Sequence, residues 1–236
     1  MDKCAIFVEG QSEQIFVREL LLRRYCWDAR NIAVRCYKLQ SEVFETAEYD
    51  FGDDDAEHFY QIVDVGNDNK VLSAMTKRAP KMNESGFTQI VGLRDMYCRV
   101  YREMSPHCVS RELNEEFINN ANELIRDMNL SETTRLHFAI MEVETWMLAL
   151  LEKWKGNISD EDIALYFDSQ AELENIFHPA AVMKNITEKT GEPYEKHKTQ
   201  VNSIMSNIEW QDFQNLYDSN RCPSFNRFMD DILPSA

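Results

Sequence analysis

The sequence predicts an α/β fold in which a mostly parallel sheet is flanked by helices and followed by a C-terminal helical subdomain. Over residues 1–155, short apolar segments that end at glycine or acidic residues alternate with helical patterns, and strands that alternate with helices form parallel sheets. From residue 156 onward the apolar spacing is helical throughout. We therefore expect two parts in this chain of 236 residues, an α/β domain over 1–155 and a helical extension over 156–236 that packs on it.

The first strand and helix set this pattern. Residues 4–8 form a short apolar run that stops at Glu9, which predicts a buried strand rather than a helix. A helix is expected over 12–25, because Ser12 suits the N-cap and Glu13 suits the positive end of the helix dipole. Apolar patterns predict four further strands, at 32–39, 59–65, 88–93 and 136–141.

Helical spacing predicts most of the other elements. In the α/β part the expected helices are 67–82, which Pro80 should end early, 111–128 and 142–154. In the C-terminal part they are 159–167, 171–176, 180–190, 201–208, 210–218 and 224–233. The strongly acidic residues 42–57 are expected to form a solvated loop or a hairpin.

The charge distribution limits the class of partner. A formal net charge of −16 excludes a generally cationic nucleic-acid coat of the histone or ribosomal type. Residues 41–68 contain ten acidic and no basic side chains, whereas residues 69–111 contain eight basic and three acidic ones. A local basic groove is still compatible with the sequence, and the 69–111 segment would supply it.

Cysteine spacing and hydropathy indicate the cellular setting. The six cysteines show no CxxC and no paired CxxC and HxxxH spacing, which argues against a zinc ribbon or finger and favours a reduced, intracellular protein. The N-terminal apolar run is too short for a signal peptide, and no stretch approaches the roughly 18 apolar residues of a membrane span. We expect a cytoplasmic protein with no membrane contact.

Acidic residues follow three of the predicted strands. Glu9 and Glu13 follow the first strand, Asp95 follows residues 88–93, and Glu142 and Glu144 follow residues 136–141. Parallel α/β sheets bind their ligands at the carboxyl ends of the strands. Several carboxylates cannot all stay ionised in one place without a cation, and a hard divalent ion with oxygen ligands is the usual solution. The pattern therefore predicts a site for Mg²⁺ or Mn²⁺.

The apolar strand followed by Glu9-Gly10-Gln11-Ser12-Glu13, with further acidic strand ends, resembles the Toprim family. It is most similar to the Toprim nuclease domain of the overcoming-lysogenization-defect nucleases and to small standalone bacterial Toprim-like proteins, which residues 140–146 and 224–228 also resemble. The resemblance covers about residues 3–150. It implies a metal-dependent nuclease that hydrolyses DNA or RNA in bacterial defence against phage, with Glu9 and Asp95 as catalytic residues.

One departure from the family leaves an alternative open. Toprim enzymes usually carry Asp-x-Asp after the central strand, whereas this chain has Arg94-Asp95-Met96, so one metal-ligating aspartate is missing and Glu142 or Glu144 would have to compensate. The missing aspartate and the net charge of −16 favour a non-catalytic Toprim-like scaffold that binds a partner protein, for example in a defence complex. A nucleotide-binding enzyme is a third class, but the sequence has no Gly-rich phosphate loop.

Basic side chains on either side of the Asp95 strand are candidates for phosphate contacts. Those named for nucleic-acid binding are Lys77, Arg78, Lys81, Arg94 and Arg99, with Lys70 and Arg102 in the same segment. A second, weaker group lies in the tail and consists of Lys184, Lys189, Lys196 and Lys198. Lys196 stands in the charged run 195–198, which favours a solvated turn over a catalytic lysine.

Ordinary structural roles compete with each of these assignments. Glu9 could simply end a strand, Glu13 could interact with the helix dipole, and Asp95 could cap a helix. If the strand continues past residue 141, only one of Glu142 and Glu144 faces the site, with a slight preference for Glu142. For a further group, helical spacing favours core packing over base stacking: Trp146, Met147, Leu150 and Trp154.

Overall fold

The fold contains one six-stranded sheet with helices on both faces. The computed structural model describes residues 2–67, 70–156, 158–167, 172–189 and 191–234. The strand order is β3-β2-β4-β1-β5-β6, and every neighbouring pair is parallel except β2 and β3. The α/β class and the mostly parallel sheet are therefore confirmed.

The strands lie close to the predicted positions. Their bounds are Asp2–Val8 (β1), Ile32–Gln40 (β2), Val43–Thr46 (β3), His58–Asp64 (β4), Gln89–Asp95 (β5) and Thr134–Ala139 (β6). The short β3 pairs antiparallel with the end of β2, so the acidic stretch begins as a hairpin.

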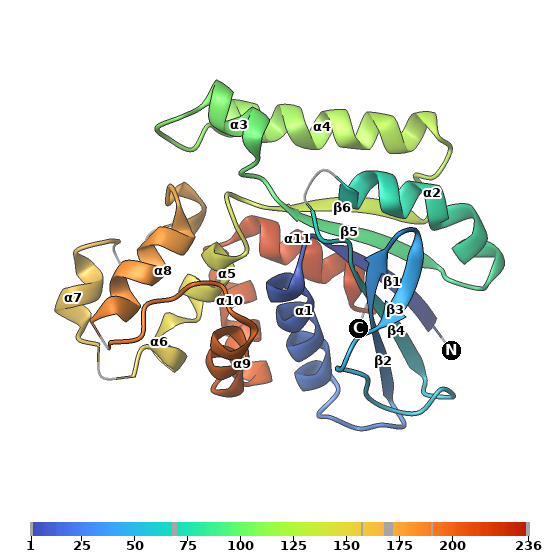
Figure 1. The fold of residues 1–236 in the computed structure, drawn as a ribbon, viewed down its shortest axis with the longest axis horizontal. Helices are drawn as coiled ribbons and strands as arrows, with labels where there is room; N and C mark the ends of the chain where they lie inside the picture. Colours follow the sequence, from blue (N-terminus) through green and yellow to red (C-terminus); the bar gives the residue numbers. More distant parts are fainter. Residues whose placement is uncertain (1, 68–69, 157, 168–171, 190, 235–236) are drawn as a thin grey trace.

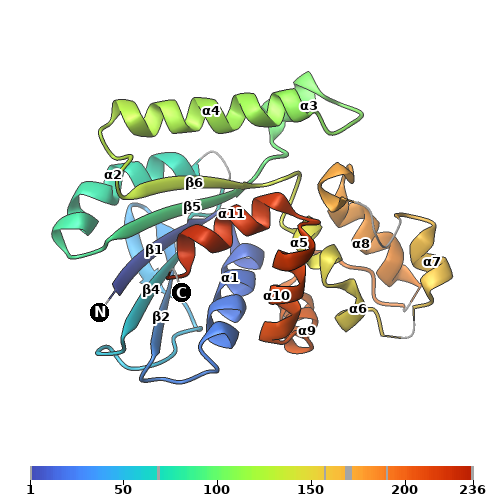
Figure 2. The same ribbon diagram turned by 180° about the vertical axis from the view of Figure 1, so that it is seen from behind.

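Two layers of helices cover the sheet. α1 (Gln11–Arg24) and α11 (Pro223–Ile232) lie on one face, and α2 (Val71–Glu84) and α4 (Arg111–Asp127) lie on the other (Figures 1 and 2). Successive side chains of a strand point to opposite faces. In the central strand β1, Ile6 therefore packs in the core beside α1, and Phe7 packs in the core beside α2.

The C-terminal helices belong to the same core as the sheet. α5 (Glu144–Ala149), α6 (Leu151–Trp154), α7 (Asp160–Ala164) and α8 (Pro179–Glu188) lie beyond the carboxyl ends of the strands (Figure 1). α9 (Lys198–Ser206) and α10 (Trp210–Ser219) pack against α1. One cluster of buried apolar side chains extends from Cys4 in β1 to Ile232 in α11.

Trp146 lies at the centre of this shared core. The side chain is fully buried and its ring stacks on Phe228 with 5.5 Å between centroids. Its Nε1–H donates to Ser224 Oγ at 3.0 Å. Met147 and Leu150 are also buried and Trp154 is partly buried, so the expectation of a core face is confirmed.

Several helices differ from the expectation. α2 continues past Pro80 to Glu84, because Pro80 is exposed while Ala79 and Met82 on either side anchor the last turn in the core. The expected helix 142–154 divides into α5 and α6 at Leu150. A short helix, α3 (Arg99–Met104), was not predicted.

Some tail elements are shorter than expected. The segment 159–167 forms only α7, and 171–176 forms a 3₁₀ turn at Leu173–Asn175; residues 171 and 190, the expected ends of two elements, lie outside the described residues. No helix among the described residues combines the length and apolarity needed to cross a membrane.

Candidate metal centre

The carboxyl ends of β1, β5 and β6 form the floor of the candidate site, because these three strands are neighbours in the sheet. Glu9 directly follows β1, and α1 begins two residues later at Gln11. Gly10, rather than Ser12, is the N-cap residue of α1; Ser12 is buried in the first turn. A Cβ atom on Gly10 would lie 3.2 Å from Glu13 Oε2, so the glycine lets this carboxylate approach the strand end.

Asp95 links the end of β5 to both neighbouring strand ends. Its backbone N–H donates to Glu9 Oε2 at 3.2 Å, and its Oδ1 accepts the N–H of Val143 at 2.9 Å. The side chain is buried, with 6% of its surface exposed. Asp95 does not cap α3, since Cys98 holds that position.

A turn after β6 brings two glutamates to the same place. β6 ends at Ala139, and Met141 adopts a left-handed conformation with φ 64°. The strand therefore does not continue, and the alternation that would separate Glu142 from Glu144 does not apply. One carboxylate oxygen each from Asp95, Glu142 and Glu144 lie within 4.8 Å of one another.

Two residues of the tail complete the cluster. Lys196 Nζ lies 3.1 Å from Glu142 Oε1 and 3.1 Å from Glu144 Oε2. The Tyr194 hydroxyl donates to Glu144 Oε1 at 2.9 Å. The Lys196 side chain is 41% exposed, as expected for a solvated turn residue, but its ammonium group also contacts two of the clustered carboxylates, which the sequence does not predict. Sequence reasoning missed Tyr194, which carries no pattern that marks it.

Burial and mutual repulsion raise the pKa values of the inner carboxyl groups. Burial, followed by the charges of Glu144 and Glu9, raises the pKa of Glu13 to about 8. Burial and the charge of Glu13 raise the pKa of Asp95 well above its usual value.

Lys196 moderates this repulsion. Burial raises the pKa of Glu144, and the nearby Lys196 ammonium opposes the increase. Burial alone would lower the pKa of Lys196, but the charges of Glu144 and Asp95 outweigh it and raise that pKa above its usual value. The lysine therefore stays charged.

These features suit a hard divalent cation. Asp95, Glu142 and Glu144 offer converging oxygen atoms, and Glu9 and Glu13 interact electrostatically with Asp95 at the border of the cluster. Mg²⁺ and Mn²⁺ prefer carboxylate oxygens. All five acidic residues chosen from the sequence are thus brought together, and the buried cluster can hold a metal ion.

The basic residues of the 69–111 segment are placed less uniformly. Arg99 lies just beyond the end of β5 and pairs with Glu103 at 2.9 Å, and the Arg94 guanidinium lies 5.6 Å from the Phe138 ring centroid. Lys81 lies in the last turn of α2, near the amino ends of the strands and away from the carboxylates. This position follows from the hydrogen bond that Lys3, near the start of β1, donates to Ser85 O at the end of α2. Lys77 and Arg78 both pair with Glu42 in the hairpin.

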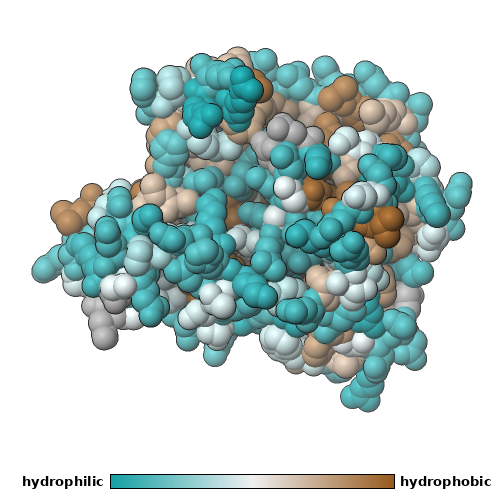
Figure 3. All heavy atoms as spheres, viewed as in Figure 1, coloured by the Kyte–Doolittle hydropathy of each residue, from teal (hydrophilic) through white to brown (hydrophobic). Residues whose placement is uncertain are grey.

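The lysines of the tail each contact a carboxylate. Lys184 pairs with Glu195, and Lys198 lies 3.6 Å from Glu48. Lys189 pairs with Asp162. The face shown in Figure 3 is mainly hydrophilic, with apolar residues in small separate groups. Lys184, Lys189 and Lys198 are therefore each paired with a carboxylate rather than grouped with one another.

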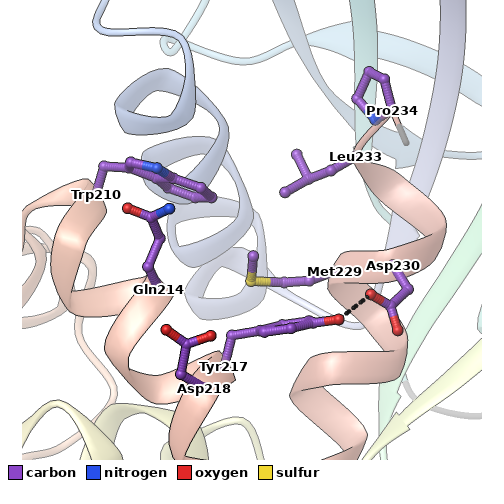
Figure 4. A pocket seen from close by; sticks show the side chains of 8 residues that line it. All are labelled: Trp210, Gln214, Tyr217, Asp218, Met229, Asp230, Leu233 and Pro234. Carbon is purple, nitrogen blue, oxygen red and sulfur yellow. Dashed lines mark hydrogen bonds between the residues drawn. The ribbon is translucent and has the colours of Figure 1, made fainter. Parts of the chain in front are cut away.

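A pocket of about 520 Å³ lies away from the carboxylates, between α10 and α11 (Figure 4). Trp210 and Tyr217 of α10 face Met229 and Leu233 across it, and the Tyr217 hydroxyl donates to Asp230 at 2.7 Å. Neither helix contributes any of the five carboxylates, so this pocket is distinct from the candidate metal centre.

Comparison with known proteins gives no relative: no family model, no curated protein and no solved structure matches the chain significantly.

Proposed function

We propose that this protein is a divalent-metal-dependent nuclease of Toprim type that hydrolyses phosphodiester bonds in DNA or RNA. The observation that carries the proposal is the convergence of Asp95, Glu142 and Glu144 within 4.8 Å at the carboxyl ends of neighbouring parallel strands. Glu9 and Glu13, which share the spacing seen in Toprim nucleases, border the same cluster.

The five carboxylates have distinct proposed roles. Asp95, Glu142 and Glu144 hold the ion, with Glu13 as a further ligand. When bound, Mg²⁺ or Mn²⁺ polarises the phosphodiester and neutralises charge that develops on the leaving oxygen. Glu9 serves as ligand or as the base that takes a proton from the attacking water. The hydrogen bond from the Asp95 backbone N–H to Glu9 Oε2 fixes the orientation of that carboxylate.

Lys196 adds a fixed positive charge to the site. Its ammonium group contacts Glu142 and Glu144 and is held charged by them. A charge in this place favours a phosphate group beside the carboxylates, which would otherwise repel it. The setting implied by the Toprim resemblance, bacterial defence against phage, is part of the same proposal.

A second candidate function is a non-catalytic scaffold that binds a partner protein. Two observations favour it. The end of β5 has a single aspartate, Asp95, in place of the Asp-x-Asp of Toprim enzymes, and Lys196 already neutralises part of the acidic cluster. The two functions differ in whether the cluster binds a divalent cation that is needed for cleavage.

The decisive comparison uses wild-type protein, Glu9→Ala and the control Glu57→Ala, which removes an exposed glutamate just before β4. Each is incubated with supercoiled plasmid, single-stranded DNA and total tRNA, with Mg²⁺, Mn²⁺ or EDTA. A nuclease should cleave only with metal, lose cleavage in Glu9→Ala and keep it in Glu57→Ala.

Calorimetric titration with Mn²⁺ distinguishes the nuclease from the scaffold if no cleavage is seen. Wild-type protein that neither cleaves nor binds Mn²⁺ would support the scaffold and end the nuclease proposal. Undiminished cleavage by a folded Glu9→Ala variant would show that the carboxylate cluster is not the active site.

A further inference from the structure

Three half-buried aromatic rings form a compact group beside the candidate metal centre. Tyr97 meets His178 edge to face with 4.7 Å between ring centroids, and His178 lies 4.0 Å from Phe177 by the same measure. Tyr97 and Phe177 are also packed edge to face, at 5.7 Å. Each of the three side chains keeps part of its surface exposed.

Short links fix this aromatic group next to the carboxylates. Tyr97 follows the cluster residue Asp95 by two positions, and its backbone N–H donates to Met141 O at 2.8 Å. On the other side, the N–H of Ala180, two residues after His178, donates to Glu142 Oε2 at 3.1 Å. The rings are therefore attached from two directions to residues of the candidate metal centre.

The backbone at His178 is unusual for a residue with a side chain. It adopts a left-handed conformation, with φ 55°, at the N-cap of α8. This conformation is uncommon for residues other than glycine, although asparagine, aspartate and histidine adopt it more often than the rest. The imidazole is held against Tyr97, and its Nε2 lies 3.5 Å from the Tyr97 hydroxyl.

The charge of the protein favours a contact to bases in addition to phosphates. The net charge is −16, and the basic side chains Lys77, Arg78 and Arg99 are already paired with carboxylates. Binding through phosphates alone depends on uncompensated positive charge. Stacking of a base on an aromatic ring adds affinity that does not depend on charge, but the base must first be unpaired.

We propose that Tyr97, Phe177 and His178 form a platform that stacks an unpaired base next to the scissile phosphate, so that the substrate is single-stranded nucleic acid. The inference rests on the proposed nuclease function and adds the class of substrate. A base in an intact duplex stacks on its neighbours and cannot reach this platform.

The test measures binding of a short fluorescein-labelled single strand by fluorescence anisotropy in Ca²⁺, and its cleavage in Mg²⁺. Each base is replaced in turn by an abasic site, and the strand is made in deoxyribo and ribo forms and as a duplex. The test variant is Phe177→Leu/His178→Asn, in which leucine keeps apolar contact and asparagine tolerates the left-handed backbone. Phe177→Tyr keeps a ring at the platform, and Phe87→Leu changes an aromatic ring at the opposite edge of the sheet.

The wild-type protein should bind the single strand more tightly than the duplex and lose about 5- to 150-fold in affinity when one abasic site falls at the platform. Phe177→Leu/His178→Asn should bind the intact strand more weakly by a similar factor and be indifferent to that abasic site. Phe87→Leu should behave as wild type, and Phe177→Tyr, which keeps a ring, should retain the sensitivity to the abasic site that Phe177→Leu/His178→Asn loses. The deoxyribo and ribo strands distinguish DNA from RNA.

Two negative results have different meanings. Wild-type protein that cleaves nucleic acid but ignores abasic sites, with a folded double variant that binds equally well, overturns the platform and leaves the nuclease intact. Wild-type protein that neither binds nor cleaves any of the strands or the duplex overturns both. If the double variant does not melt cooperatively, Phe177→Leu alone is compared with Phe87→Leu in the same assay.

Discussion

Lys196 Nζ lies 3.1 Å from Oε2 of Glu144, a side chain with no exposed surface and 52 residues earlier in the chain. The contact joins the loop between α8 and α9 to the start of α5. Lys196 itself adopts a left-handed backbone conformation, with φ 57°. The tail therefore completes the acidic cluster with an internal cation, and the site depends on residues from both parts of the sequence.

Replacement of this lysine should destabilise the metal-free protein. In Lys196→Met the buried Glu144 carboxylate loses its counter-ion and must either stay unpaired or take up a proton. Lys196 is partly solvent-exposed, so we expect a decrease of about 1–3 kcal/mol in the free energy of unfolding rather than the 3–5 kcal/mol of a fully buried pair. Urea unfolding in EDTA at pH 8 measures this change.

The matched control is Lys198→Met, because Lys198 is of similar exposure but lies 3.6 Å from the exposed Glu48. It should change the free energy of unfolding by less than about 0.5 kcal/mol. Saturating Mn²⁺ should restore part of the stability that Lys196→Met loses. It should not restore any small loss of stability in Lys198→Met. Equal losses in the two variants would show that Lys196 is not a counter-ion to the cluster.

The stability of the metal-free protein should decrease as the pH increases from about 5 to 8. Burial and neighbouring carboxylates raise the pKa of Glu13 from 4.5 to about 8, so the folded state binds a proton that the unfolded state has released. The stabilisation is complete below the unfolded pKa and is lost as the pH rises through the folded one. The slope for one such group is at most about 1.4 kcal/mol per pH unit.

Glu13→Gln tests the origin of this pH dependence. Urea unfolding in EDTA between pH 5.5 and 8.5 should give a flatter profile for Glu13→Gln than for wild-type protein. With saturating Mg²⁺ the wild-type profile should also flatten, because metal binding requires ionised carboxylates and strengthens as the pH increases. A wild-type protein in EDTA that becomes more stable towards pH 8 would contradict the raised pKa of Glu13.

Neutralisation of Asp95 should have opposite effects on stability and on metal binding. Asp95→Asn keeps the Oδ1 acceptor for the Val143 N–H but removes a buried ionisable carboxyl group next to Glu13 and Glu9. The metal-free protein at pH 8 should gain about 0.5–2 kcal/mol in the free energy of unfolding, as is common when a functional site is relieved of repulsion. Its affinity for Mn²⁺, measured by calorimetry, should decrease by at least about tenfold.

Asp64→Asn provides the comparison for this result. Asp64 ends the neighbouring strand β4, is buried and accepts the N–H of Gly66 at 2.8 Å, but it is not among the clustered carboxylates. Its replacement should leave the affinity for Mn²⁺ unchanged. If the two variants lose Mn²⁺ affinity equally, Asp64 also belongs to the metal site, and the site then extends to the end of β4.

The parts of the site that the sequence predicts are those tied to strand ends. Glu9 and Asp95 lie at or just after the ends of β1 and β5, and the parallel order of the sheet alone brings such positions to one edge. Glu142 and Glu144 come soon after β6, whose carboxyl end lies at the same edge of the sheet beside β5. Their joint approach needed the left-handed turn at Met141, which an apolar pattern does not reveal.

Lys196 and Tyr194 could not be placed in this way. They lie in the loop between α8 and α9, and its path depends on tertiary packing rather than on periodicity. The short helix α3 escaped prediction since, of its six residues, only Tyr101 is buried, so it shows no amphipathic stripe. Continuation of α2 past Pro80 likewise reflects packing of Met82, which sequence propensity does not include.

The fragment 1–155 should not fold alone, because it lacks α11, which covers β5 and β6 on the face that α1 shares. Phe225, Phe228 and Ile232 are almost completely buried in the core that also contains Trp146. Burial of each side chain contributes about 1.5–3 kcal/mol, so their removal together approaches the whole net stability of a domain, about 5–15 kcal/mol.

We expect the fragment to show no cooperative urea transition by circular dichroism. The full-length variant Phe228→Ala should still unfold cooperatively, with a loss of about 3–5 kcal/mol. A fragment with a cooperative transition and dispersed amide resonances would show instead that residues 1–155 form an independent domain.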